Sequence, residues 1–294
     1  MTPQLRLIFV HGISAEVVKG DYTVELCALL RAKLTAHGVL PPNATQDEID
    51  QIVTFEHVNY SDVGQTEEEG VLAAYRQERG KLYSLPDDAL ELIAYDKVRA
   101  QMITAVSDCL VYESAVQRDE IRKRLVDAVT PYVRSSDTVS IVGHSLGSVV
   151  AFDVAYYNSR HNDDWLKAGF KPTNLFTMGS PIALFSMEMD DTTGQQKPRY
   201  APTGTGDAVA ATGDMQPNLA AGVWYNFLDA QDLIAYPLET LFKGKFQVKD
   251  FRVETGLLPI SAHTGYWHNA DVADRIAQRL KLDLARIRVP VGVP

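Results

Sequence analysis

The sequence has few cysteines, no long apolar run and no cluster of basic residues. Its two cysteines, Cys27 and Cys109, are too few for a disulfide framework, and each falls in an apolar helical pattern. We therefore expect both to be buried free thiols. No stretch of the chain reaches 18 apolar residues, so we expect no integral membrane segment.

Positive charge is also scarce. Lys and Arg together number 28 against 38 Asp and Glu, a formal net charge of −10. Nucleic acids and anionic membrane surfaces select basic patches, so we expect neither as a partner. The N-terminal residues lack the cationic segment, long apolar core and cleavage site of a signal peptide, which makes a cytoplasmic location the expectation. Nothing in the sequence fixes the oligomeric state.

The composition is that of an ordinary globular protein. Hydrophobic residues make up 46% of the 294 residues and charged residues 22%, which is enough for a sizeable core in one α/β domain. Amphipathic helical patterns alternate with short apolar runs, and this alternation predicts a parallel sheet between two layers of helices. The expected fold is thus an α/β three-layer sandwich with about six strands, at residues 5–10, 52–60, 138–142, 174–178, 223–228 and 246–254.

Two segments interrupt this alternation within a single predicted domain, residues 1–294. Residues 61–116 are mostly helical in pattern, with an apolar stripe from Tyr95 to Leu110. This insertion either packs permanently against the body or forms a mobile lid over the site. Residues 190–220 are rich in Gly, Thr, Pro and Ala, which predicts a long surface loop.

The sequence Gly143-His144-Ser145-Leu146-Gly147 lies between a β-branched strand pattern and a helical pattern. In that context, Gly-x-Ser-x-Gly is typical of a nucleophile elbow. The two glycines lack Cβ atoms, so strand and helix can pack closely around a strained turn with Ser145 at its tip. We therefore predict Ser145 as the nucleophile.

A serine nucleophile needs a base and an acid, which on a parallel sheet follow it in the order acid, then histidine. Only His263 and His268 follow both the nucleophile and the last strand. His263, in a loop of small residues, is the stronger candidate, because His268 stands at the start of the final helix. For the acid, Asp232 is preferred over Asp229, since the apolar residues after it would hold it in place. Asp229 lies nearer the strand end, and Glu239 is a remote third choice.

The developing oxyanion needs backbone N–H donors. One is expected from Leu146, at the start of the helix, and the other from Ile13, in the loop His11-Gly12-Ile13 after the first strand. Gly12 would let the backbone approach closely; the alternative is a plain strand-to-helix turn. Ser180, which lacks a second glycine after it, is interpreted as part of a structural turn.

No metal site or cofactor is expected. Asp190 and Asp191 are adjacent carboxylates near the predicted opening of the active site, but they lack the spacing and histidine partners of a catalytic metal site. Activity should therefore survive chelators.

Five motifs follow one another along the chain: Phe9-Val-His-Gly12, Gly143-His-Ser-Leu-Gly147, Met178-Gly-Ser-Pro181, Trp224-Tyr-Asn-Phe227 followed by Asp232, and His263-Thr-Gly-Tyr-Trp267. Together, these motifs resemble the lipase/esterase-like serine hydrolases of the α/β-hydrolase fold. The similarity runs from residue 5 to about residue 275, with 61–116 and 190–220 outside it. As a departure from the family, we expect the two antiparallel strands that usually precede the first parallel strand to be absent.

The resemblance implies hydrolysis of a carboxylic ester through an acyl-enzyme, carried by Ser145, Asp232 and His263. The expected partner is a small-molecule or lipid ester. Thioester and amide hydrolysis would use the same machinery, so a thioesterase or amidase is an alternative. A catalytically silent interaction module of the same fold is the alternative from a different class. The acyl chain length and the physiological substrate cannot be predicted.

Overall fold

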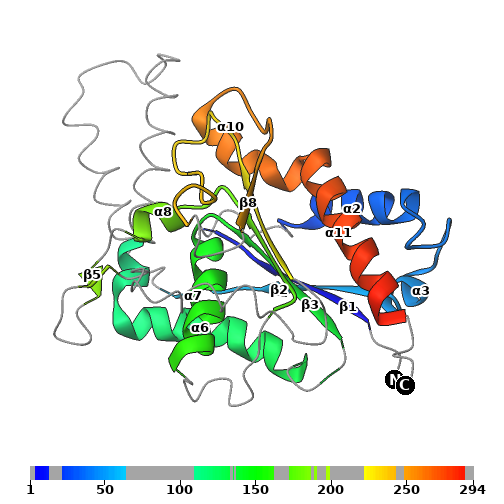
Figure 1. Ribbon diagram of the computed structural model, residues 1–294, viewed down its shortest axis with the longest axis horizontal. Helices are drawn as coiled ribbons and strands as arrows, with labels where there is room; N and C mark the ends of the chain where they lie inside the picture. Colours follow the sequence, from blue (N-terminus) through cyan, green and yellow to red (C-terminus); the bar gives the residue numbers. More distant parts are fainter. Residues whose placement is uncertain are drawn as a thin grey trace.

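A six-stranded parallel sheet forms the centre of the protein (Figure 1). The computed structural model describes residues 4–12, 22–63, 109–132, 135, 137–161, 172–186, 189–190, 197–198, 222–242 and 248–288. The strand order β2-β1-β3-β4-β7-β8 confirms the predicted sheet and puts the strand before Ser145 in its interior. The strands are β1 (Leu5–Val10), β2 (Val53–Val58), β3 (Thr138–His144), β4 (Asn174–Met178), β7 (Val223–Leu228) and β8 (Val248–Arg252).

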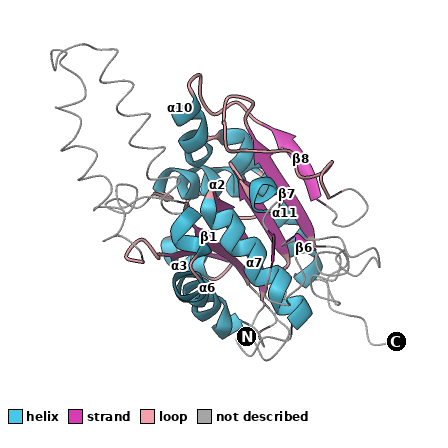
Figure 2. Cartoon of the chain, turned by 90° about the vertical axis from the view of Figure 1, so that its left-hand side faces the viewer, coloured by secondary structure: helices cyan, strands magenta, loops and turns pink. Residues whose placement is uncertain are grey.

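Helices cover both faces of the sheet, which gives the predicted three layers (Figures 1 and 2). Helices α6 and α7 lie on one face, and α2 and α11 on the other. The bounds are α2 (Val24–Ala36), α3 (Gln46–Asp50), α6 (Ala115–Val129), α7 (Leu146–His161), α8 (Ile182–Phe185), α10 (Pro259–Thr264) and α11 (Ala270–Arg288), with 3-10 helices η1 (Thr130–Tyr132) and η3 (Gly265–His268).

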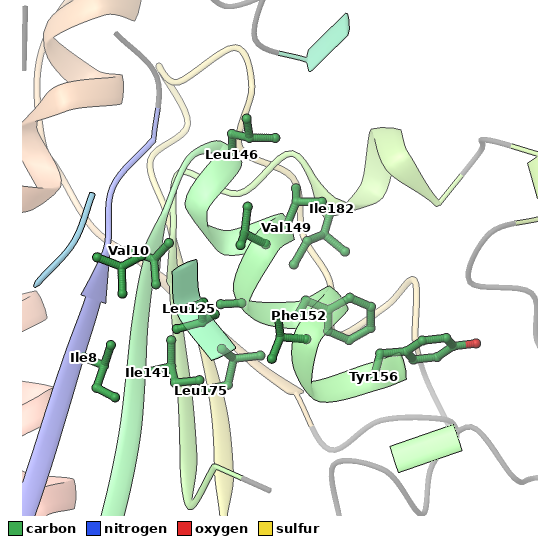
Figure 3. Close-up of a cluster of buried hydrophobic side chains, with 14 of the residues drawn as sticks. Ile8, Val10, Leu125, Ile141, Leu146, Val149, Phe152, Tyr156, Leu175 and Ile182 are labelled. Carbon is green, nitrogen blue, oxygen red and sulfur yellow. The ribbon is translucent and has the colours of Figure 1, made fainter. Parts of the chain in front are cut away.

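The sheet has a hydrophobic core on each face, and the apolar side chains of a strand point alternately into one core and the other. In β1, Leu7 and Phe9 pack with α2 and α11, whereas Ile8 and Val10 pack with α6 and α7. Figure 3 shows Ile8 and Val10 on the side of the sheet that faces α7. All four side chains have no exposed surface, as expected for a parallel sheet covered on both sides. The strands are therefore a rigid support for the loops at their carboxyl ends.

The strand order reverses between β1 and β3. The chain runs from β1 outward to β2, then returns to form β3 on the other side of β1. Ligands of open α/β sheets bind outside the carboxyl ends of the strands at such a switch point. The register pairs Val10 with Gly143, so the loop after β1 and the turn at Ser145 leave the sheet side by side at this point.

The structure differs from the sequence predictions at two positions, His263 and Cys109. Helix α7 begins at Leu146, because the turn at Ser145 leads directly into it. His263 lies in the short helix α10, started by a proline at its N-terminus, and not in a loop. Cys27 is buried as expected, but Cys109 is only half-buried. Leu110, the last residue of the predicted apolar stripe, is 66% exposed, whereas Tyr112 is buried and donates a hydrogen bond to Asp153.

Much of the two predicted insertions lies outside the described residues. Of 61–116, residues 64–108 are not described, so the choice between a packed helix and a lid stays a prediction. Residues 191–196 and 199–221, which include most of the predicted surface loop, are not described either. Within the predicted loop, β5 (Met189–Asp190) and β6 (Lys197–Pro198) pair as a two-stranded antiparallel ladder. In the described part of the chain, no helix has the length and apolarity needed to cross a membrane.

Candidate active site

Ser145 sits at a strained turn between β3 and α7. Its φ is 52°, a left-handed conformation that serine rarely adopts, as the Gly-x-Ser-x-Gly pattern predicts. The backbone N–H of Ser145 donates to the carbonyl of Met178 at 2.9 Å, and the hydroxyl of Ser148 donates to the carbonyl of Ser145 at 2.6 Å. The strain is therefore held in place by bonds to the neighbouring strand and the first turn of the helix.

The glycines on either side of Ser145 have no room for a side chain. A Cβ atom at Gly143 would lie 2.6 Å from Ser148 Cα, and one at Gly147 would lie 2.2 Å from the carbonyl oxygen of His11. Gly147 thus brings α7 directly against the loop after β1. These contacts explain why both positions require glycine.

The structure brings Ser145, His263 and Asp232 into one hydrogen-bonded row. The Ser145 hydroxyl lies 2.9 Å from His263 Nε2, and His263 Nδ1 lies 2.9 Å from Asp232 Oδ2 and 3.0 Å from Oδ1. A carboxylate only accepts, so Nδ1 carries the proton and Nε2 accepts from Ser145. His268, the other candidate, instead contacts Glu25 at an exposed position.

Asp232 is a buried carboxylate surrounded by donors. Besides His263, it accepts from the N–H of Ile234 at 3.0 Å and from the hydroxyl of Tyr266 at 3.0 Å. Burial acts to raise the pKa of Asp232, but the hydrogen bonds from His263, Ile234 and Tyr266 outweigh it and hold the pKa below its usual value. The group is therefore an anion at neutral pH, aligned on the imidazole.

Asp229, the competing carboxylate, has other partners. Its Oδ2 accepts from the N–H of Thr255 and lies 2.8 Å from the Thr255 hydroxyl oxygen, and its Oδ1 accepts from the N–H of Gln231 at 2.8 Å. Burial acts to raise its pKa, but these bonds together lower it. Asp229 therefore ties the end of β7 to the turn that follows β8, whereas Asp232 faces the histidine.

The turn after β4 packs against the side chains of Asp232 and His263. Gly179 has a φ of +57°, and a Cβ there would lie 2.9 Å from Asp232 Oδ2 and 3.2 Å from His263 Nδ1. Next to it, the hydroxyl of Ser180 donates to Ser148 Oγ at 2.7 Å, since the Ser148 proton is already donated to the carbonyl of Ser145. Ser180 thus belongs to the packing of this turn.

The predicted oxyanion loop lies against Ser145. A Cβ at Gly12 would be 2.4 Å from Ser145 Cβ, so only glycine permits this approach. His11 is buried and its ring stacks on Tyr60, whose hydroxyl donates to the carbonyl of His11 at 2.6 Å. Burial lowers the pKa of His11, which keeps the ring neutral. Ile13, the predicted donor, lies outside the described residues.

Leu146 is the first residue of α7, so its N–H has no intrahelical partner. Its side chain is buried in the core beside Val149 and Ile182 (Figure 3), which fixes the backbone at the start of the helix. The N-terminal end of the helix carries a partial positive charge. This end of α7 is therefore suited to hold a negative oxygen next to Ser145.

The sequence did not predict that two further residues, Tyr266 and His144, contact Asp232 and His263. Tyr266 bridges the acidic residues, since its hydroxyl accepts from the N–H of Asp229 at 2.8 Å and donates to Asp232. His144 was singled out only as part of the elbow, yet its Nε2 lies 2.6 Å from the backbone carbonyl of His263. Neither contact has a sequence signal, because both depend on how distant turns meet. Among the described residues, no group of three or more His, Cys, Asp or Glu is arranged to hold a metal ion.

The strand order, the turn at Ser145 and the position of the site at the switch point define an α/β-hydrolase-like fold, as the sequence predicts. No protein-family model matches the chain. A stretch of 122 residues is 30% identical to a probable mitochondrial phospholipase of Schizosaccharomyces pombe. This match covers 36% of the chain and only 16% of that protein.

Similar solved structures include an esterase of Rhizomucor miehei, with 13% identity, a TM-score of 0.42 and coverage of 97% of this chain and 76% of that one. A thioesterase of the prodiginine pathway in Streptomyces coelicolor has 16% identity, a TM-score of 0.39 and coverage of 96% and 86%. A carboxyl esterase of Bacillus coagulans has 12% identity, a TM-score of 0.34 and coverage of 98% and 91%. The strand order and the turn at Ser145 define the fold of this chain by themselves.

Proposed function

We propose that this protein is a serine hydrolase that cleaves carboxylic esters. The observation that carries the proposal is the continuous row of hydrogen bonds from Ser145 through His263 to Asp232, with Ser145 at a positive φ. A serine hydroxyl becomes nucleophilic when a base within hydrogen-bond reach takes its proton and a third group orients that base. The geometry supports these roles for the three residues in that order.

In the proposed first half-reaction, His263 Nε2 takes the proton of Ser145 as Oγ attacks the ester carbonyl carbon. The carbonyl oxygen becomes an oxyanion, which the N–H of Leu146 and a donor of the loop after Gly12, proposed to be Ile13, would stabilise. The imidazolium is stabilised by the anionic Asp232. The tetrahedral intermediate then collapses, and His263 gives its proton to the departing alkoxide, which leaves as the alcohol.

In the second half-reaction, water replaces the alcohol. His263 takes a proton from the water as its oxygen attacks the acyl carbon on Ser145, and the same donors hold the second oxyanion. Collapse of this intermediate returns the proton to Ser145 Oγ and releases the carboxylic acid. The net change is ester plus water to acid plus alcohol, and each step uses only the groups of this site.

The partial similarity to a probable phospholipase suggests which class of ester to test first. Although the match covers a small part of that protein, it favours a lipid ester over a sugar or peptide ester as the substrate. We therefore propose that the acyl group is a fatty acyl chain. A set of p-nitrophenyl esters from acetate to palmitate tests this, because a lipid-ester hydrolase should prefer the longer chains.

Covalent labelling tests the proposal itself. A fluorophosphonate should modify Ser145 and abolish ester hydrolysis, whereas Ser145→Ala should be unlabelled and lose about 10⁶-fold in kcat. Ser180→Ala is the matched control, because Ser180 is a buried serine outside the hydrogen-bonded row. It should remain labelled and active, with at most about 1 kcal/mol lower stability. A protein that neither reacts with the probe nor hydrolyses any ester in the set would contradict the proposal and favour a silent interaction module.

A further inference from the structure

His144 connects the turn that carries Ser145 with the helix that carries His263. Its Nε2 lies 2.6 Å from the backbone carbonyl oxygen of His263, a residue 119 positions later in the chain. A carbonyl only accepts hydrogen bonds, so the proton is on Nε2 and His144 donates. The two rings are close neighbours, with centroids 4.9 Å apart.

We infer that His144 is a positioning residue for the base, whose Nε2–H fixes the backbone of His263 so that one imidazole meets Ser145 and Asp232 together. This inference rests on the proposed function, because it assigns His144 a role in the reactivity of the same site. His144 does not contact the reacting atoms itself; it acts through the carbonyl group of His263.

The carbonyl of His263 needs such a donor because of its place in the chain. Helix α10 has only six residues, and its last carbonyl groups lack helical partners. Side chains from the preceding turn and from the turn at Ser145 contact this end instead. The Thr255 hydroxyl oxygen lies 2.6 Å from the carbonyl oxygen of Ala262 and 2.8 Å from Asp229 Oδ2, so its single proton is donated to one of these two acceptors, and His144 donates to the next carbonyl. The backbone N–H of Thr255 donates to Asp229, which holds Thr255 in place, so the helix that carries the base is fixed from both sides.

The surroundings of His144 favour a neutral imidazole. The ring is buried and packs edge-on against Trp267 at 5.3 Å and tilted against Tyr266 at 5.9 Å. Burial, with a smaller effect of the nearby His263, lowers the pKa of His144 to about 3. His144 therefore donates its hydrogen bond without placing a second positive charge beside the imidazolium that forms on His263.

Two substitutions separate the hydrogen bond from the packing. In His144→Gln the side-chain amide keeps an N–H donor near the position of Nε2 but loses the ring. In His144→Phe the ring remains against Tyr266 and Trp267, but the donor is lost. If His144 positions His263, the Phe variant should lose about 10- to 100-fold in kcat with KM nearly unchanged, and the Gln variant should recover most of that loss. If His144 only fills space, the order reverses and Phe is the more active variant, which would overturn the inference.

The test of the proposed function is independent of the test of the role of His144. Labelling of Ser145 in the unsubstituted protein by a fluorophosphonate establishes the function, and a His144→Phe variant that matches the parent in kcat would then defeat the positioning role alone. If both variants fail to fold, ¹⁵N spectra of the histidine rings in the unsubstituted protein decide. The positioning role requires neutral His144 with the proton on Nε2 at neutral pH; a proton on Nδ1 or a charged ring excludes it.

Discussion

The hydroxyl of Tyr266 donates a 3.0 Å hydrogen bond to Asp232 Oδ2, the same oxygen that lies 2.9 Å from His263 Nδ1. The N–H of Asp229 donates to that hydroxyl in turn. One buried phenol therefore links Asp229 to Asp232, and through Asp232 to His263 and Ser145. Burial, with the nearby carboxylate of Asp232, raises the pKa of Tyr266, which keeps the phenol protonated and able to donate.

Tyr266→Phe should therefore weaken the site without removing any member of the proposed triad. Loss of the hydroxyl leaves the buried N–H of Asp229 without this acceptor and takes one donor from Asp232, at a cost of about 1–3 kcal/mol in stability. Because Asp232 stays bonded to His263 and to Ile234, kcat should fall by no more than about 100-fold. Thermal melts and steady-state kinetics check both effects; a stable variant with unaltered kcat would show that Tyr266 is only a packing residue.

The two acidic residues should respond in opposite ways to loss of charge. Asp232→Asn should lower kcat by about 10⁴-fold, because an amide cannot hold the required histidine tautomer or stabilise the imidazolium. Asp229→Asn should mainly lower stability, by about 1–3 kcal/mol, because the amide cannot accept from both Thr255 and Gln231 as the carboxylate does. Activity per folded molecule and unfolding by urea distinguish them. An inactive Asp229→Asn beside an active Asp232→Asn would show that the acid is misassigned.

Gly179→Ala tests how tightly the acid and the base are packed. The positive φ makes alanine unfavourable by roughly 1–2 kcal/mol, and the new methyl group would press on Asp232 Oδ2 and His263 Nδ1. We expect a fall in kcat of about 100-fold. Gly38→Ala is the matched control, because Gly38 has a φ of +71° with no atom within 4 Å of the added Cβ. It should lose similar stability and keep its activity, and equal kcat values for the two variants would contradict the steric argument.

Acid should destabilise the protein in part through His144. Its pKa is lowered to about 3 in the folded state, below the ordinary value of 6.5, so the unfolded chain binds the extra proton first. This contribution to stability is complete above about pH 6.5 and is lost as the pH falls toward 3, at up to about 1.4 kcal/mol per pH unit. His144→Phe should lose less stability than the parent between pH 7 and pH 5. Buried His11, with its lowered pKa, remains in both proteins and contributes equally. Parallel curves for parent and variant would mean that His144 is charged or exposed in solution.

The sheet was predictable because each strand has a short apolar pattern of its own. The alternation of Leu7, Ile8, Phe9 and Val10 between two helical layers follows from burial on both faces, which the sequence displays directly. The positions of Ser145 and of the residues after β7 and β8 followed in the same way, because parallel strands end at one edge. Thus local pattern and topology together predicted which residues would meet.

What the sequence did not predict depends on contacts between distant turns. His263 was expected in a loop, because six residues give too short a pattern to display helical periodicity. The bonds of Tyr266 to Asp232 and of His144 to the carbonyl of His263 join segments that no local rule relates. The preference for Asp232 over Asp229 rested on its apolar neighbours, whereas the structure separates the two residues by what each carboxylate accepts.

The candidate site draws on five separated stretches of the chain, around Gly12, Ser145, Gly179, Asp232 and His263, and each follows a different strand of the sheet. A partly folded chain that lacks both β7 and β8 would have the turn at Ser145 but would have neither Asp232 nor His263 in place. Contacts between residues so far apart in sequence close late and slowly during folding, because loop-closure entropy opposes them. The return of serine reactivity after dilution from denaturant is therefore a kinetic marker for completion of the whole sheet, and it should lag behind the return of helical circular dichroism.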